Sequence, residues 1–254
     1  MKNKYKERSS NWFPMRFTAF FLLIALFYGT ILPAQSPYEL MGGKEAAILG
    51  GGATVLGVSI PIDKRVQPLT EEEIALLNID NVWGVDRWVT RQWSLPAQNT
   101  SDVFLFSSFA LPATLLIDQP SRGEFGQVGL FTLESLLLTT GLTNLTKAIV
   151  KRPRPFMYNP DVPMELKLKK RSRYSFFSGH TSITASMSFL TAKMYHDFYP
   201  DSNARTAVWA TAAAIPALTG YLRIRGGKHY LTDVLVGYGI GAAVGILVPQ
   251  LHKL

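Results

Sequence analysis

Leu231 to Leu251 reads Leu-Thr-Asp-Val-Leu-Val-Gly-Tyr-Gly-Ile-Gly-Ala-Ala-Val-Gly-Ile-Leu-Val-Pro-Gln-Leu. Gly237, Gly241 and Gly245 recur every four residues, which places them on one face of a helix where a neighbouring helix can approach closely. No strand pattern precedes these glycines, so they do not form a dinucleotide-binding fingerprint. The stretch therefore predicts a long apolar helix with a close helix-packing face.

Further apolar runs with helical character occupy residues 46–62, 102–118, 127–150, 180–197 and 205–222. The run from Thr206 to Leu222 has no charged residue, as expected for a buried or lipid-facing helix. By contrast, Glu134, Asn144 and Lys147 require one face of the 127–150 run to meet protein or water. No convincing strand, internal repeat or low-complexity tract is visible. The sequence predicts an all-α bundle of about six helices.

Runs of about 17 to 20 apolar residues are long enough to cross a bilayer. The mean hydropathy of the chain, +0.11, is low for a polytopic membrane protein, although the polar stretches 63–101 and 151–178 lower it. We expect a membrane-embedded bundle, with a soluble all-helical protein as the alternative. The glycine-rich 46–62 run either spans, lies at the interface or packs on the bundle, because glycine is commoner in membrane helices than in soluble ones.

The N-terminus has the pattern of a targeting segment. Five basic residues precede the apolar run from Phe17 to Leu32, which ends at Pro33 and Ala34. A basic segment, an apolar segment and a small residue together describe a secretory signal, here with possible cleavage after Ala34. The run is also almost long enough to remain as an uncleaved anchor.

The chain therefore divides into three predicted parts: a signal peptide or anchor at 1–34, an N-terminal extension at 35–101, and a core at 102–254. The extension should contain one apolar helix at 46–62 and one amphipathic helix. Thr70 is the expected N-cap of the amphipathic helix, because Glu73 three residues later completes a capping box.

Composition narrows the classes of partner and chemistry. The 254 residues include 26 Lys and Arg against 18 Asp and Glu, and the formal net charge of +8 favours an anionic partner. The aromatic residues lie within apolar runs rather than among basic residues, which argues against nucleic acid. Cysteine is absent, so disulfides, thiolate catalysis and zinc–thiolate sites are excluded.

The first of three polar segments is Lys147-Ala-Ile-Val-Lys-Arg-Pro-Arg154-Pro155. Lys147 is expected near a helix end, and Pro153 breaks the helix and holds Arg154 extended. Two cations at one corner could then bind different oxygens of one phosphoryl group. Taken alone, the same residues would also fit cations that complement a helix dipole.

The second segment, Ser178-Gly179-His180, precedes an apolar helical run. Ser178 is a suitable N-cap and Gly179 permits close approach, so the free backbone N–H groups of the first turn could bind an anion. His180 would then lie beside a bound phosphate, where it could protonate a leaving oxygen. The alternative is an ordinary polar residue in the first turn of a helix.

The third segment runs from Arg223 to Asp233 and contains a turn at Gly226-Gly227. His229 and Asp233 are four residues apart, so they share a helix face and Asp233 can fix the tautomer of His229. An imidazole oriented in this way presents its other nitrogen as a nucleophile. A purely structural His–Asp pair is the alternative.

Together the segments have the order and spacing Lys-x6-Arg-Pro, Ser-Gly-His and Arg-x5-His-x3-Asp. Over about residues 102–251 the chain resembles the type 2 phosphatidic acid phosphatase superfamily, which also includes bacterial class A acid phosphatases and vanadium haloperoxidases. Two positions depart from the family pattern: Phe177 replaces a proline and Leu222 replaces a serine. The lost serine hydroxyl puts one phosphate contact in doubt.

The resemblance implies a metal-independent phosphatase that needs no cofactor and reacts through a phosphohistidine. By position, His229 would be the nucleophile, Asp233 its orienting residue and His180 the general acid. The residues implied in phosphate binding are Lys147, Arg154, Ser178, Gly179 and Arg223.

The implied substrate is a phosphomonoester or diphosphate of a membrane lipid: phosphatidate, phosphatidylglycerol phosphate, a polyprenyl diphosphate or lipid A. Three alternatives remain open. They are a secreted soluble acid phosphatase of broad specificity, a haloperoxidase in which His229 ligates vanadate, and a non-enzymatic anion-binding membrane protein with a degenerate site.

We expect a bacterial-type inner-membrane protein with a periplasm-facing site, or a soluble periplasmic protein. The positive-inside rule alone would place the basic 151–173 loop in the cytoplasm, but binding of an anionic substrate also explains its charge. If residues 17–32 cross the membrane and 46–62 does not, both loops of the site face outward. If 46–62 also spans, the site faces the cytoplasm.

Overall fold

The structure is a computed structural model and describes residues 36–254. The predicted signal or anchor therefore lies outside the described residues. Residues 36–254 form one compact unit of helices, with an isolated β-bridge between Tyr38 and Lys253 and no strand. The predicted all-α class is confirmed for this part of the chain.

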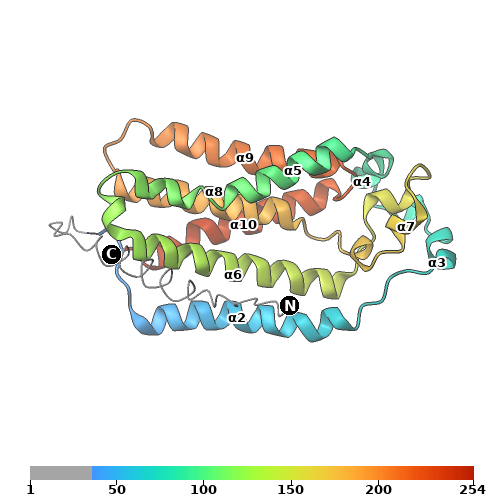
Figure 1. Ribbon diagram of the computed structural model, residues 1–254, viewed down its shortest axis with the longest axis horizontal. Helices are drawn as coiled ribbons and strands as arrows, with labels where there is room; N and C mark the ends of the chain where they lie inside the picture. Colours follow the sequence, from blue (N-terminus) through green and yellow to red (C-terminus); the bar gives the residue numbers. More distant parts are fainter. Residues whose placement is uncertain (1–35) are drawn as a thin grey trace, which may run out of the picture. The chain divides into compact units, whose positions relative to one another are not determined.

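Within residues 36–254, long helices run roughly along a common axis (Figure 1): α2 (Gly42–Lys64), α5 (Leu95–Ser108), α6 (Phe125–Val150), α8 (Gly179–Phe198), α9 (Arg205–Arg225) and α10 (Leu231–Leu251). Three short helices, α3 (Glu71–Ala75), α4 (Gly84–Arg87) and α7 (Met164–Lys167), lie in the connections at one end of this bundle. At the start of α3, Thr70 and Glu73 form the predicted capping box, with Thr70 Oγ1 accepting from Glu73 N at 3.2 Å.

The helix predicted at 102–118 begins seven residues earlier and is interrupted. The side chain of Ser94 accepts from Ala97 N, Pro96 stands in the first turn, and α5 ends at Ser108 before a 3-10 helix at Pro112–Ile117. Proline is tolerated at this position because the first-turn N–H groups have no intrahelical acceptor. Asp102, the first residue of the expected core, therefore lies in the middle of a helix.

The glycine face of α10 packs against α8, which confirms the predicted packing face. A Cβ atom added to Gly237, Gly241 or Gly245 would lie 2.7, 2.0 or 2.4 Å from a backbone carbonyl oxygen of α8 or of its N-cap. These distances are well inside van der Waals contact, so only glycine allows the two helices to lie this close. The contact fixes the start of α8 relative to the start of α10, where the site lies.

The other end of the bundle joins the two ends of the described chain. Glu39 N donates to His252 O at 2.9 Å, and Lys44 Nζ donates to Leu251 O at 2.7 Å. His252 is buried, with Nε2 3.4 Å from Glu45 Oε1 and 3.8 Å from the fully buried Glu134. Of the polar residues predicted to need protein or water on α6, Glu134 therefore lies inside the protein, whereas Asn144 is exposed.

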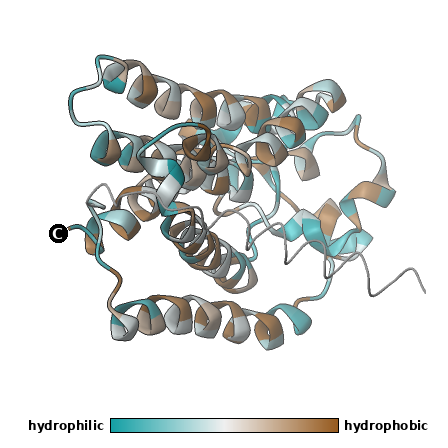
Figure 2. Ribbon diagram, turned by 60° about the vertical axis from the view of Figure 1, so that its left-hand side comes forward, coloured by the Kyte–Doolittle hydropathy of each residue, from teal (hydrophilic) through white to brown (hydrophobic). Residues whose placement is uncertain are grey.

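Among residues 36–254, four segments are long and apolar enough to cross a membrane: Gly42–Lys64, Leu95–Ile117, Ser121–Tyr158 and Leu231–Leu251. Apolar residues run along these helices, and the polar residues gather mainly in the connections (Figure 2). Much of this apolar surface is exposed, as at Phe106 and Leu235. The 46–62 run thus has the length and composition of a span, which the sequence left open.

Candidate active site

The structure brings the three polar segments together at the bundle end that carries α3, α4 and α7. Lys147 lies in the last turn of α6, whose C-cap Lys151 has a left-handed conformation with φ 52°. The chain then continues extended through Arg154, whose N–H donates to Ser172 O at 2.8 Å. Phe156 N donates to Gly227 O at 3.0 Å, so the chain after the predicted break returns to the third polar segment.

The start of α8 meets Lys147. Ser178 is the N-cap, and its side chain accepts from Thr181 N. A Cβ atom on Gly179 would lie 3.0 Å from Lys147 Nζ, so the ammonium group rests directly against the first turn of α8. Phe177, which stands where the family pattern has proline, is buried with 1% exposure. A cation and free helix N–H groups therefore converge on one point, as anion binding requires.

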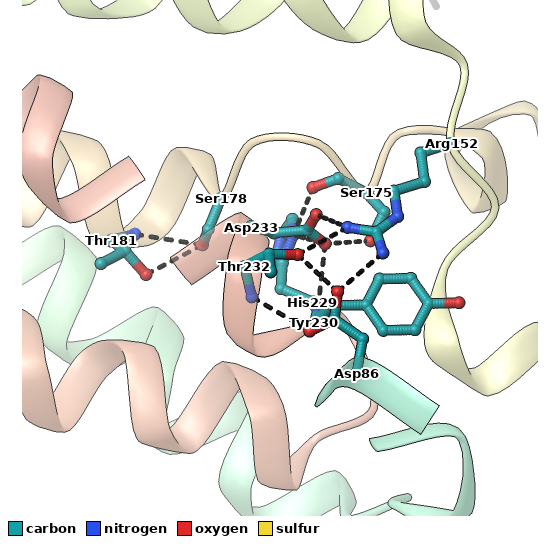
Figure 3. A network of polar contacts seen from close by, with 9 residues as sticks. All are labelled: Asp86, Arg152, Ser175, Ser178, Thr181, His229, Tyr230, Thr232 and Asp233. Carbon is teal, nitrogen blue, oxygen red and sulfur yellow. Dashed lines mark hydrogen bonds and ion pairs between the residues drawn. The ribbon is translucent and has the colours of Figure 1, made fainter. Parts of the chain in front are cut away.

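His229, which precedes α10, is almost completely buried, with 1% exposure. Its Nδ1 donates to the carbonyl oxygen of Ser175 at 2.6 Å, which leaves Nε2 as the unprotonated nitrogen of the neutral ring (Figure 3). Burial first, and then the positive charges of Arg154 and Arg223, hold the pKa of His229 well below 6.5. The imidazole is therefore neutral at physiological pH and can act as a nucleophile.

Asp233 contacts the same loop from the first turn of α10. Its Oδ2 accepts from Ser175 Oγ at 2.5 Å and from Tyr230 N at 2.9 Å. The distance from Oδ2 to His229 Nδ1 is 3.7 Å, which is too long for a hydrogen bond. The i, i+4 spacing places the two side chains on one face, but the carbonyl of Ser175 fixes the tautomer and Asp233 holds the Ser175 residue.

A buried network supports Asp233 from behind (Figure 3). Arg152 Nη1 donates to Asp233 Oδ1 at 2.5 Å, and Arg152 Nη2 donates to Asp86 Oδ2 at 2.8 Å. Asp86 has no exposed surface and accepts also from Thr232 N at 3.1 Å. The guanidinium of Arg152 lies 3.9 Å from the centre of the Tyr230 ring. Asp86 of α4 thus orients Arg152, and Arg152 in turn holds the carboxylate of Asp233.

Asp102 of α5 contacts both the implied general acid and one of the implied phosphate-binding residues. Asp102 Oδ1 lies 2.7 Å from His180 Nε2 and 3.4 Å from Arg223 Nη1. Ser101 Oγ accepts from Arg223 Nη1 at 3.0 Å. Helix α5 therefore positions both His180 and Arg223.

Two of the guanidinium groups implied in phosphate binding retain unused donors. The Nε atoms of Arg154 and Arg223 are buried and have no hydrogen-bond acceptor among residues 36–254. A buried donor without a partner is unfavourable unless a ligand or water supplies the acceptor. Together with Lys147, these groups form a cationic site suited to a phosphoryl group. Among residues 36–254, no group of three or more His, Cys, Asp or Glu side chains is placed to hold a metal ion.

Lys228 adds a cation at the edge of the site. Its Nζ lies 5.1 Å from the Trp93 ring centre and 4.8 Å from that of Phe156. Burial, followed by the charges of Arg154 and Arg223, lowers the pKa of Lys228 to about 7.

Several of these groups were missed by sequence reasoning: Asp86, Trp93, Ser101, Asp102, Ser175 and Lys228. Lys228 adjoins His229 in the chain and was the easiest to infer. Arg152 was counted only as part of the basic loop, although it stands within the first motif.

Comparison with known proteins supports the family resemblance that the three segments indicated. A family model described as PAP2 superfamily matches residues 129–254. The lipid A 4'-phosphatase of Porphyromonas gingivalis is 27% identical over 153 residues, which are 59% of this chain and 61% of that protein. The match thus spans less than two thirds of the length of this curated relative.

Among solved structures, a transmembrane PAP2 type phosphatidylglycerolphosphate phosphatase from Bacillus subtilis is similar, with a TM-score of 0.46 and 19% sequence identity. The match covers 94% of each chain.

Proposed function

Because this chain belongs to the PAP2 superfamily, we propose that it is a phosphatase of membrane lipids that reacts through a phosphohistidine on His229. The observation that carries the proposal is a buried, neutral imidazole whose Nδ1 is held by Ser175 O and whose neighbours are Lys147, Arg154 and Arg223. A fixed nucleophile beside fixed cations is what phosphoryl transfer needs, because catalysis of this reaction is mostly positioning and charge stabilisation.

In the first step, His229 Nε2 attacks phosphorus and the bond from phosphorus to the lipid oxygen breaks. His180 gives its proton to that oxygen, so the lipid leaves as an alcohol, or as a phosphate if the substrate is a diphosphate. In the second step, water attacks the phosphohistidine, His180 accepts a proton from the water, and inorganic phosphate leaves. Arg154, Arg223 and Lys147 stabilise the charge on the phosphoryl oxygens in both steps.

Asp102 has a defined part in this scheme. Its carboxylate accepts a hydrogen bond from His180 Nε2 and so opposes the effect of burial, which lowers the pKa of His180 to about 3 in the free protein. It acts together with the negative charge of a bound phosphate to favour the protonated ring that the first step requires. It also neutralises part of the charge of Arg223 until a phosphate binds. Asp233, Ser175 and Arg152 act on His229 by holding the loop that carries its hydrogen-bond acceptor.

Membrane lipids are the substrates that we favour over soluble esters. Four helices of the described chain have the length and composition of membrane spans, so the site lies at the end of apolar helices rather than on a wholly polar surface. Lipid A is the first candidate, because the curated relative is named for it. Phosphatidate, phosphatidylglycerol phosphate and polyprenyl diphosphates follow. A secreted acid phosphatase of broad specificity is the alternative.

We place the site on the periplasmic side of the inner membrane. Helix α10 leads from the site to the bundle end where Glu39 pairs with His252, so a spanning α10 puts Glu39 and Leu254 on the cytoplasmic side. Since α2 qualifies as a span, this topology differs from the arrangement expected from the sequence, in which the 46–62 run does not cross the membrane.

The charge of the basic loop is compatible with a periplasmic site. Its cations make specific contacts, for example Lys170 Nζ with Asp63 Oδ2 at 2.7 Å and Arg152 with Asp86. A green fluorescent protein fused after Leu254 should fluoresce, because this topology reporter matures in the cytoplasm. Activity of an alkaline phosphatase fused at the same point would instead reverse the assignment.

The direct test of the proposed function uses purified full-length protein in detergent with a panel of lipid phosphates and p-nitrophenyl phosphate. Release of phosphate should be lost in His229→Ala and kept in His196→Ala, the control at the far end of α8. Labelled phosphate should also be trapped on the wild-type protein as an alkali-stable, acid-labile adduct. Full turnover by His229→Ala would refute the nucleophile, and preference for the small ester would favour the soluble-type phosphatase.

A further inference from the structure

The chain segment from Trp83 to Trp88 exposes large apolar side chains beside the site. Trp83 is 69% exposed, Val85 44% and Trp88 47%. Three such side chains within six residues are costly to leave in water. The segment contains α4 and leads into a 3-10 helix at Trp88–Arg91.

Asp86, between these side chains, points the other way and is fully buried. It accepts from Thr232 N at 3.1 Å and from Arg152 Nη2 at 2.8 Å, and so ties α4 to the first turn of α10. The exposed side chains are therefore held in place by a rigid anchor.

This anchor also fixes the depth of the segment relative to the spans. Thr232 is the second residue of the candidate span Leu231–Leu251, and the candidate span Leu95–Ile117 begins four residues after Arg91. The segment thus lies level with the ends of two spans, where hydrocarbon meets headgroups. Tryptophan is enriched at this boundary because its ring is apolar and its N–H needs a polar partner.

We propose that Trp83, Val85 and Trp88 form a lipid-contact surface that inserts into the headgroup–acyl boundary of the leaflet that the site faces. The partner is the bilayer surface, and specifically anionic lipid, because the exposed Arg91 follows the apolar side chains directly in the chain. The inference rests on the proposed membrane location, but it does not depend on which lipid phosphate is hydrolysed.

The surface is close in the chain to the edge of the site. Trp93 follows Arg91 by two residues and faces Lys228, which precedes His229 in the chain. A headgroup held at the surface would therefore lie near the cation of Lys228. The surface should lower KM for substrates in a bilayer, since it holds the site mouth at the depth of the headgroups.

The decisive test is the depth of the two tryptophans. Full-length protein is placed in vesicles of phosphatidylcholine and phosphatidylglycerol, with bromine on the acyl chains near the headgroup end. The fluorescence that is lost in Trp83→Phe/Trp88→Phe should be quenched by these bromines and shielded from aqueous iodide. Quenching of that fluorescence by iodide alone would overturn the proposal.

Kinetics give a second readout. In Trp83→Ser/Trp88→Ser, the ratio of kcat/KM for vesicle-embedded lipid to kcat/KM for p-nitrophenyl phosphate should fall about tenfold. Ile117→Ser is the matched control, because Ile117 is 76% exposed but ends the same candidate span that Leu95 begins. An equal fall in the control would overturn the proposal. If no substrate is turned over, the proposed function fails, while the quenching measurement still shows whether Trp83 and Trp88 insert into the bilayer.

Discussion

Gly237→Ala tests whether the packing of α10 on α8 sets the geometry of the site. The added Cβ would lie 2.7 Å from Ser178 O and 3.3 Å from Ser178 N. Ordinary contact begins at 3.4 Å, so the two backbones must separate by about 0.7 Å. Ser178 is the N-cap of α8, and its N–H donates to Asp233 O at 3.0 Å, so the strain acts directly on the phosphate-binding turn.

Two effects oppose each other in the stability of this variant. Overpacking in a close helix contact costs about 1–3 kcal/mol, and alanine gains about 1 kcal/mol over glycine within a helix. The expected loss of unfolding free energy is therefore small, about 0–2 kcal/mol. A displacement approaching 1 Å at a catalytic site can cost about 100-fold in rate, so we expect kcat/KM to fall about 10- to 100-fold.

Two further glycines provide matched controls. A Cβ on Gly239 meets nothing within 4 Å, so Gly239→Ala should keep full activity and equal or higher stability. A Cβ on Gly245 would lie 2.4 Å from Ser186 O, two turns farther from the site, so Gly245→Ala should lose stability with a smaller loss of activity.

Thermal unfolding in detergent and initial rates with one lipid phosphate measure both quantities for the three variants. Unchanged kcat/KM in Gly237→Ala would refute the reasoning. Losses of activity that simply follow stability across the series would refute it as well.

Three other perturbations have defined outcomes. Asp86→Asn should lower kcat/KM about tenfold or more, because the buried hydrogen bond to Arg152 loses the negative charge of its acceptor. The control Asp80→Asn removes only an exposed ion pair and should have little effect in the same rate assay. Lys228 has a pKa of about 7, so it is cationic below pH 7 and neutral above, and kcat/KM for an anionic substrate should fall as the pH rises through 7. A pH series should show that Lys228→Met lacks this limb, and an unchanged limb would assign it to another group. Turnover should survive dialysis against EDTA, and recovery only on addition of a divalent cation would contradict the metal-independent mechanism.

The helical class and the place of the site could be predicted from the sequence because both depend on local patterns. The glycine spacing in α10 depends on the helical repeat alone, and it indicated the packing face without naming α8 as the partner. The N-cap at Ser178 and the break at Pro153 follow from backbone chemistry of the residues themselves. Such signals need no knowledge of distant parts of the chain.

The support of the site could not be predicted in this way. Asp86 contacts Arg152 and Thr232 across 66 and 146 residues of sequence, and it lies in a polar connection that looks exposed. Spacing also gives a shared helix face but not a distance, so the 3.7 Å gap between His229 and Asp233 was not foreseeable. The earlier start of α5 did have a signal, since Ser94 and Pro96 form a standard helix beginning.

The groups that react with or bind the phosphate, and the groups that position them, are encoded in different stretches of the chain. The motif residues from Lys147 to Asp233 all lie within the matched residues 129–254, whereas Asp86, Trp93 and Asp102 precede them. A chimaera that exchanges residues 36–128 would therefore keep every reacting side chain and replace its surroundings. In a lineage of such proteins, substrate preference could diverge through the first half of the gene while the chemistry stays encoded in the second.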